Sequence, residues 1–210
     1  MMQKKNSLTL KTLAATALAF SLAACGSSPP TQFYTLTSPA DGGASTRTAG
    51  QGPQSFIEVM PVAVPERLAR PQLVVRSDAT RVEVLEQDRW ASPFNNELRD
   101  ALAAGVASRL GAIDVSRSGR PADQVSYRIN VELRDFEATR NGQVQAVFGW
   151  TITRSGDRRS LACRLTAVEP VSGASNAEVV AATQKVVAQA VQEIAGNVRS
   201  LQAGQGQCSS

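Results

Sequence analysis

The stretch Tyr127-Arg128-Ile129-Asn130-Val131-Glu132-Leu133-Arg134 decides the fold, because apolar side chains alternate in it with charged or polar ones. A period of two is typical of a strand that has one face on a core and the other in water. The pair Asn141-Gly142 favours a tight turn, and Ser155-Gly156-Asp157 favours a second turn. Each turn leads into a further alternating segment, whose inward residues are Val144, Ala146, Phe148, Trp150 and Ile152 and then Leu161, Cys163, Leu165 and Ala167. The pattern therefore predicts three consecutive antiparallel strands.

Shorter strand signals precede this sheet. Phe33 to Thr37 and Phe56 to Met60 are rich in strand formers, and Leu73 to Val75 and Val82 to Leu85 flank a polar turn that is typical of a hairpin. Residues 38–55 are almost all Gly, Ala, Ser, Thr, Pro and Gln, a composition typical of a flexible linker. We therefore expect the first strand to pair far from its sequence neighbours.

Two segments have the periodicity of amphipathic helices. Ser92-Pro93 offers an N-cap and a proline for the first helical position, and apolar residues then recur at three- and four-residue spacing until Gly111. Ser175 and Glu178 match a capping box. The second helix carries a stripe that we expect to face the core rather than to form a binding groove: Val180, Thr183, Val187, Ala190, Ile194 and Val198. The sequence thus predicts an α+β fold, a single domain in which two amphipathic helices pack on a mostly antiparallel sheet.

The N-terminus has the pattern of a bacterial lipoprotein signal. Lys4, Lys5 and Lys11 precede an apolar run, residues 13–22, that is too short to span a bilayer. Leu22-Ala23-Ala24-Cys25 then predicts cleavage before Cys25 and acylation of its thiol. The alternative is an ordinary secretory signal with an incidental cysteine. Gly26 in place of an aspartate favours the periplasmic face of the outer membrane.

These features divide the chain into four parts. We expect a lipoprotein signal peptide at residues 1–24, and a lipidated tether with the first strand and the linker at residues 25–55. The folded domain is expected at residues 56–203, and a disordered polar tail at residues 204–210.

Composition excludes several classes of function. Removal of residues 1–24 leaves 186 of the 210 residues, with 19 basic against 18 acidic side chains and no basic block that would favour nucleic acid. The chain has no histidine, which excludes Ser-His-Asp and Cys-His catalysis and histidine-ligated metals. Lone carboxylates such as Asp114, Asp135 and Glu169 have no partner at a spacing that places both on one face. We therefore predict no catalytic residue, no metal and no cofactor, and hence a protein that is not an enzyme.

Two cysteines remain beyond the predicted lipidation site, Cys163 and Cys208. They could pair in an oxidising periplasm. Cys163, however, lies in an alternating segment between Leu161 and Leu165, on the same face. We therefore favour a buried free thiol at Cys163 over a disulfide.

Several sequence blocks, taken in order, resemble a known family. They are the lipobox ending at Cys25, the strand Phe33-Tyr34-Thr35-Leu36, the block from Val62 to Arg76, and Asp88-Arg89-Trp90-Ala91-Ser92-Pro93 at the head of a helix. The alternating strand from Tyr127 and the strand around Trp150 follow. This order resembles the PqiC (YmbA) family of ABC-type transport auxiliary lipoproteins over nearly all of the mature chain.

The resemblance implies a non-enzymatic subunit of a mammalian-cell-entry (MCE) type system, which moves lipids between the inner and outer membranes. In that role the lipoprotein docks the periplasmic MCE partner to the outer membrane, while a permease and an ATPase supply the energy. The chain has no Gly-x-x-x-x-Gly-Lys nucleotide-binding loop, which agrees with nucleotide binding by another subunit. The alternative is a periplasmic carrier that holds a lipid or lipopeptide in an apolar pocket of its own. Assembly into a homo-oligomer stays open.

The block from Pro65 to Arg76 supplies the candidate partner-binding residues Arg67, Arg70, Pro71 and Gln72. The arginines could pair with carboxylates of the partner. The structural alternative is a turn, because Pro65 and Pro71 each restrict the backbone and bias the preceding residue toward extended geometry. Trp90, just before the helix, is predicted to be a hydrophobic plug against that helix rather than a ligand contact.

Overall fold

The computed structural model describes residues 29–37, 55–119 and 123–208, so the predicted lipidation site Cys25 and most of the linker lie outside the described residues. The chain divides into two compact units, Met1–Pro30 and Thr31–Ser210. The fold described below is that of the second unit.

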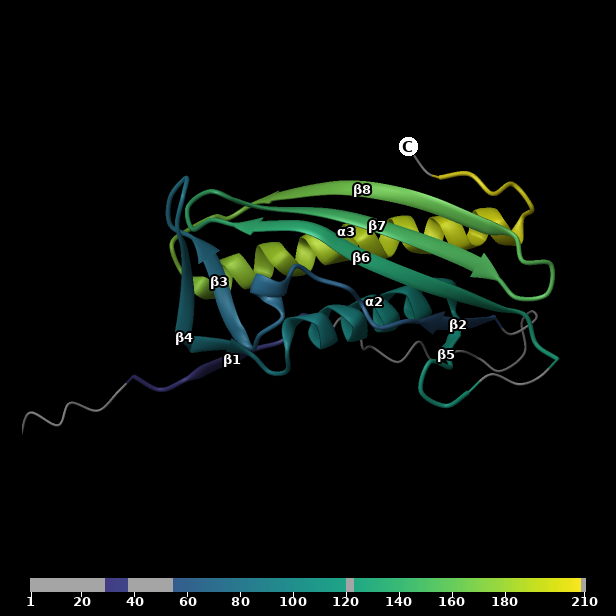
Figure 1. Cartoon of the computed structure of the whole chain (residues 1–210), viewed down its shortest axis with the longest axis horizontal. Coiled ribbons are helices and arrows are strands. Elements are labelled where there is room, and N and C mark those ends of the chain that lie inside the picture. Colours follow the sequence, from purple (N-terminus) through teal and green to yellow (C-terminus); the bar gives the residue numbers. More distant parts are fainter. Residues whose placement is uncertain (1–28, 38–54, 120–122, 209–210) are drawn as a thin grey trace, which may run out of the picture. The chain divides into compact units, whose positions relative to one another are not determined.

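The predicted antiparallel strands are confirmed. β6 (Ser126–Ala138), β7 (Gln143–Arg154) and β8 (Ser160–Pro170) pair in that order (Figure 1). The predicted inward faces of β6 and β7 are buried, and on β8 Leu161 and Ala167 are buried while Cys163 and Leu165 are half-buried. Alternate residues such as Asn130 and Glu132 point to solvent. Asn141 in the β6–β7 turn has a φ of +53°, a conformation that asparagine adopts more readily than most residues.

Parallel strands extend this sheet. β2 (Phe56–Val59) pairs in parallel with β6 on one side and with β5 (Ile113–Asp114) on the other, which gives the order β5-β2-β6-β7-β8. Parallel strands need a long connection between them, and the segment between β2 and β6, which contains α2, provides it. The α+β class is therefore confirmed, with sheets that are mixed rather than purely antiparallel.

A second, smaller sheet has the order β1-β4-β3. β3 (Gln72–Arg76) and β4 (Val82–Trp90) form the predicted hairpin. β1 (Gln32–Tyr34) runs parallel to the end of β4, from Asp88 to Trp90. The first strand thus pairs far from its neighbours in sequence, as predicted.

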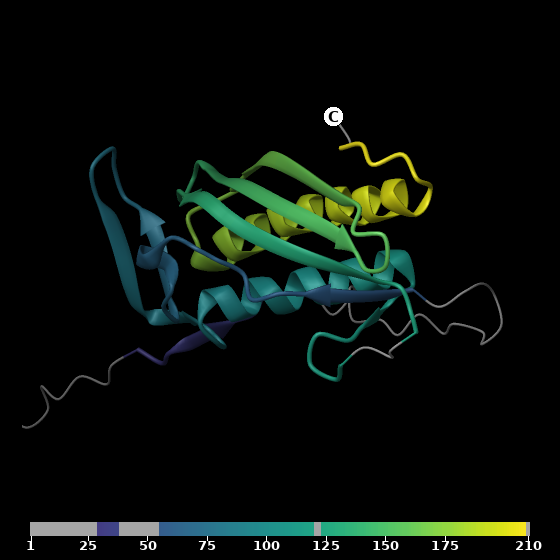
Figure 2. The ribbon, with the colours of Figure 1, turned by 45° about the vertical axis from the view of Figure 1, so that its right-hand side comes forward.

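Two helices, α2 (Phe94–Leu110) and α3 (Asn176–Gln202), pack against each other. α3 lies across the inner face of β6, β7 and β8, and α2 lies beside β2 (Figures 1 and 2). Every residue of the predicted α3 stripe is buried, which confirms that this stripe faces the core. The helices approach closely at Gly105, where an added Cβ would lie 2.8 Å from a methyl carbon of Val191.

The two helix starts differ. The capping box of α3 is confirmed, because the Glu178 amide donates to the Ser175 hydroxyl at 3.3 Å and the Ser175 amide donates to the Glu178 carboxylate at 3.0 Å. The prediction that Ser92 caps α2 is wrong. Pro93 occupies the cap position without a side-chain hydrogen bond, and the Ser92 hydroxyl donates instead to the Glu97 carboxylate at 2.9 Å. At the other end Gly111 takes a φ of +62°, as a C-terminal cap requires.

The two tryptophans are core residues. Trp90 is 6% exposed, and its ring centroid lies 5.2 Å from that of Phe94, so the predicted plug against α2 is confirmed. Trp150 is 5% exposed on the inner face of β7.

The expectation of a free thiol at Cys163 is wrong. Cys163 forms a disulfide with Cys208, with Cα atoms 5.8 Å apart. The chain after α3 turns back toward the edge strand β8 through Gly204 and Gly206, which both have positive φ. Cys163 lies half-buried on that edge strand, where the returning tail reaches it.

Candidate functional site

The four predicted partner-binding residues lie in the segment that leads from β2 into β3. A 3-10 turn, η1 (Glu66–Leu68), follows Pro65, whose carbonyl accepts from the Leu68 amide at 2.8 Å. Leu68 is buried and attaches the turn to the core. The segment after Pro65 is thus a structural turn.

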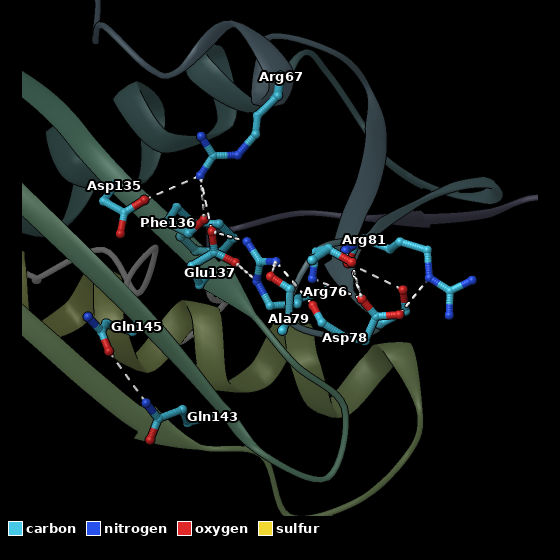
Figure 3. Close-up of polar contacts among 12 residues, drawn as sticks. Arg67, Arg76, Asp78, Ala79, Arg81, Asp135, Phe136, Glu137, Gln143 and Gln145 are labelled. Atoms are coloured by element: carbon cyan, nitrogen blue, oxygen red, sulfur yellow. Dashed lines mark hydrogen bonds and ion pairs between the residues drawn. The ribbon is translucent and has the colours of Figure 1, made fainter.

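Arg67 is engaged within the chain. Its Nη2 donates to the Phe136 carbonyl at 3.1 Å and lies 3.3 Å from a carboxylate oxygen of Asp135 and 3.4 Å from one of Glu137 (Figure 3). β6 is irregular between Leu133 and Asp135, and this register shift brings Asp135 and Glu137 toward η1. The side chain is 42% exposed, so Arg67 joins η1 to β6 and still reaches solvent.

Glu137 is shared by two arginines. Arg76, at the end of β3, donates to it through Nη2 at 2.7 Å and also through Nε, while Arg67 approaches from the other side (Figure 3). The hydrogen bonds from Arg76 lower the pKa of Glu137, and the same contact raises the pKa of Arg76. This network, Arg67–Glu137–Arg76, links the small sheet to the large sheet.

The β3–β4 turn is closed by Asp78. One carboxylate oxygen accepts from the amides of Thr80 and Arg81, both at 2.9 Å, and the other accepts from the Arg81 guanidinium at 2.5 Å. These bonds, led by the one from the Thr80 amide, lower the pKa of Asp78. The arrangement is an Asx-type turn that shapes the hairpin.

Arg70 differs from Arg67. Within the described residues its side chain forms no ion pair, and its Nε is buried without a hydrogen-bond partner. Its carbonyl accepts from the Phe94 amide at 3.4 Å, which holds the backbone against the start of α2. Among the described residues, Arg70 is therefore a cation without an ion pair, held on a fixed backbone.

Pro71 and Gln72 have structural contacts. The Pro71 carbonyl accepts from the Trp90 amide at 2.6 Å, and the Gln72 amide group donates to the Glu86 carboxylate at 3.3 Å. Arg67 and Pro71 thus hold the turn, whereas Arg70 makes no ion pair among the described residues.

The apolar interior beneath this block is filled. A cavity of about 10 Å³ lies between the small sheet, Phe136 and α3, with Trp90 and Phe94 in its wall. That volume is close to one water molecule, whereas sites for drug-sized ligands take about 300–1,000 Å³. This cavity does not hold an acyl chain.

The outer face of the large sheet carries an open concavity of about 690 Å³. Its lining is mixed: the polar residues Asn130, Glu132, Arg134, Thr151 and Arg164 lie among apolar ones such as Pro61, Ala63, Val131 and Ala162. Arg134 pairs with Glu132 at 3.0 Å and covers Gly149, where an added Cβ would lie 3.0 Å from the guanidinium Nε. Because this concavity is open and charged side chains lie in its wall, it does not enclose an apolar ligand.

Two absences hold for the described residues alone. No group of three or more His, Cys, Asp or Glu side chains is arranged to hold a metal ion there. No helix in that part of the chain has the length and apolar character needed to cross a membrane.

Some contacts were not predicted from the sequence. Asp135 and Glu137 were not recognised as partners of Arg67, because the irregularity in β6 changes which residues face η1. The hydrogen bond from Trp150 to Asn197 was also not predicted. Asn197 lies directly before Val198 of the α3 stripe, and a polar residue so close to a core-facing stripe indicates a buried hydrogen-bond partner.

Comparison with known proteins gives a consistent picture. The family described as "ABC-type transport auxiliary lipoprotein component" matches residues 34–195. The chain is 26% identical over 152 residues to the intermembrane transport lipoprotein PqiC of Escherichia coli K12, covering 72% of this chain and 79% of that protein. The match to PqiC of Shigella flexneri has the same values.

Solved structures share the fold. A crystal structure of an uncharacterised protein has a TM-score of 0.62 at 21% identity, covering 81% of this chain and 99% of that chain. A protein from Xanthomonas campestris has a TM-score of 0.51 at 21% identity, covering 72% of this chain and 85% of that chain.

Proposed function

The chain belongs to the family of ABC-type transport auxiliary lipoprotein components, and on that basis we propose that it is a non-enzymatic subunit of an MCE-type intermembrane lipid transport system. It is anchored by acylated Cys25 to the periplasmic face of the outer membrane, where it docks the periplasmic MCE partner. The relatives named as intermembrane transport lipoproteins support the transport role.

The filled interior is the observation that favours docking over the carrier alternative. A carrier has to enclose an acyl chain, and the apolar cavity between the small sheet and α3 has a volume of about 10 Å³. The concavity of about 690 Å³ on the outer face of the large sheet is open and has a mixed polar and apolar lining. Surfaces of mixed polarity are typical of protein–protein contacts.

Arg70 is the residue that we place at the centre of the docking surface. Its guanidinium has no ion pair among the described residues, and its buried Nε has no partner. A carboxylate of the MCE partner would pair with the charge of Arg70. Arg67 and Pro71 lie beside it in the same segment, and this surface ends at Gln72, the first residue of β3.

The anchor is tested by metabolic labelling with a radioactive fatty acid. We expect the wild-type chain to carry label and to fractionate with the outer membrane, and Cys25→Ser to remain an unprocessed precursor without label. Label that persists in Cys25→Ser would contradict the lipoprotein assignment.

Docking and carrying are separated by what co-purifies with the tagged mature chain after mild detergent extraction. We expect the MCE-domain protein and no stoichiometric phospholipid or lipopeptide, as measured by mass spectrometry of both fractions. A bound lipid at one molecule per chain, without the MCE-domain protein, would establish the carrier alternative instead.

A further inference from the structure

Phe33 is the most exposed of the large apolar side chains in the described ranges. It is 67% exposed, whereas the others with large exposure, Val82, Ile113, Val125 and Val168, lie between 38% and 44%. It belongs to β1, which has a free edge because the small sheet has the order β1-β4-β3. An aromatic ring at this position is a feature that the core does not explain.

The alternation of β1 forces the ring outward. Tyr34, the next residue, is half-buried and donates its hydroxyl to Asp88 at 2.9 Å, and Leu36 is 2% exposed. Since neighbouring side chains of a strand point to opposite faces, the inward position of Tyr34 places Phe33 on the outer face. A polar side chain would satisfy the fold there equally well, so the ring is suited to a contact outside the domain.

The neighbours of Phe33 on that face are a cation and an amide. Phe33 lies opposite Arg89 of β4, and Arg89 lies opposite Gln72 of β3. Arg89 is 37% exposed and lies 3.4 Å from the Glu86 carboxylate, which is itself 64% exposed. An aromatic ring beside an exposed guanidinium suits the interface of a bilayer, where rings lie at the headgroup level and cations face phosphates.

The covalent chain keeps this face near the membrane. Eight residue steps separate Phe33 from Cys25. Fully extended, eight steps reach about 26–29 Å, and a flexible chain of that length has a typical end-to-end distance of roughly 16 Å. When Cys25 is acylated, Phe33 is therefore held within a short distance of the lipid surface. Tethering of this kind gives a weak contact a high effective concentration.

We propose that the outer face of the β1-β4-β3 sheet, with Phe33 as its apolar contact and Arg89 beside it, rests on the lipid surface that carries the anchor. Phe33 enters the headgroup region, and Arg89 faces lipid phosphates. The acyl chains supply the affinity, and this face sets the orientation of the domain on the membrane. The inference rests on the lipid anchor of the proposed function.

The test exploits the disulfide. Because Cys163 and Cys208 are paired, Cys25 is the remaining thiol of the mature chain. The chain from Cys25 onward, which contains the whole compact unit from Thr31, is coupled through that thiol to maleimide-bearing lipid in vesicles of phosphatidylethanolamine and phosphatidylglycerol. Since the attachment is chemical, the result does not depend on acylation in the cell.

The probe is Phe33→Trp, and the matched control is Val168→Trp, at an exposed position on β8 of the other sheet. The emission of the buried Trp90 and Trp150 is subtracted by means of the unsubstituted chain. We expect the added tryptophan at position 33 to shift to shorter wavelength on the vesicles and to lose intensity with brominated lipids. The tryptophan at position 168 keeps its aqueous emission. Unfolding midpoints of both variants serve as the folding control.

Three outcomes would overturn the inference. Aqueous, unquenched emission at position 33 on the vesicles means that the face does not meet lipid. Equal quenching at both positions means that the domain has no preferred orientation. A spectral shift at position 33 that requires addition of the MCE-domain protein means that the face binds that protein instead. Failure of the fatty-acid labelling at Cys25, by contrast, would contradict the proposed function and leave these spectra unchanged.

Discussion

The indole Nε1 of Trp150 donates a hydrogen bond of 3.0 Å to the side-chain oxygen of Asn197, and thereby joins the middle of β7 to α3 inside the core. Asn197 is 1% exposed and Trp150 is 5% exposed. A buried indole N–H requires a partner, so this pair fixes how the sheet and the helix meet.

We expect Asn197→Ala to lower the free energy of unfolding by about 1–3 kcal/mol, because the indole N–H of Trp150 then loses its buried acceptor. Trp150→Ala is expected to cost about 3–5 kcal/mol, since it also empties a core position. Urea unfolding measures both values. A double variant that costs the full sum of the two single variants would contradict a direct coupling between these residues.

The disulfide is expected to stabilise the chain by about 2–4 kcal/mol through the long loop that it closes in the unfolded state. Cys163 and Cys208 are 45 positions apart in the sequence. Urea unfolding with and without reductant gives the difference, and Cys208→Ser should match the reduced wild type. A non-reducing gel should show a mobility shift on reduction that is lost in both Cys163→Ser and Cys208→Ser. The absence of a mobility shift in the wild type would contradict the disulfide and favour a free thiol at Cys163.

The lowered pKa of Glu137 predicts how the free energy of unfolding depends on pH. The hydrogen bonds from Arg76 lower the pKa of Glu137 below its ordinary value of 4.5. A carboxylate with a lowered folded-state pKa contributes stability above its unfolded pKa, and that contribution is lost as the pH falls through the folded pKa. Glu137→Gln should therefore destabilise the chain at pH 7, and the difference from the wild type should shrink below the ordinary pKa.

The control for this prediction is Glu132→Gln. Glu132 pairs with Arg134 but is 56% exposed, so its removal should change little at either pH. Equal destabilisation by Glu132→Gln and Glu137→Gln at pH 7 would show that the link between the two sheets through Glu137 has no special weight.

The parts of the fold that were predictable from the sequence rest on local patterns. The alternation from Tyr127, the Ser175–Glu178 capping box and the α3 stripe each depend on residues within a few positions of one another, and all three are confirmed. The predicted α2 cap at Ser92 also rested on a local pattern, but it is wrong. The Ser92 hydroxyl donates a hydrogen bond to the Glu97 carboxylate and does not cap the helix backbone.

Contacts between distant segments were not predictable in the same way. The parallel pairing of β2 with β6 and the return of Cys208 to Cys163 depend on where whole elements lie. The same holds for the candidate site. Sequence spacing selected the arginines of the 65–76 block, but only the fold shows that Arg67 pairs with Asp135 and Glu137, while Arg70 makes no ion pair among the described residues.

That distinction sharpens the test of docking. Reversal of charge at Arg67 would break its contacts with Asp135 and Glu137, whereas Arg70 makes no ion pair among the described residues, so Arg70→Glu should lower the unfolding midpoint less than Arg67→Glu does. Arg164→Glu is the matched control, because Arg164 is exposed and lies on the outer face of the large sheet.

The most direct measurement of the central claim is the dissociation constant of the mature chain for the MCE-domain protein of its transport system, with these two variants in parallel. Truncating or reversing one partner of a close charge pair typically costs at least about 2 kcal/mol, which corresponds to a roughly thirtyfold weaker complex for Arg70→Glu. Arg164→Glu should bind as the wild type does. Wild-type binding by Arg70→Glu, together with loss of binding by Arg164→Glu, would place docking on the outer face of the large sheet and contradict the account given for Arg70.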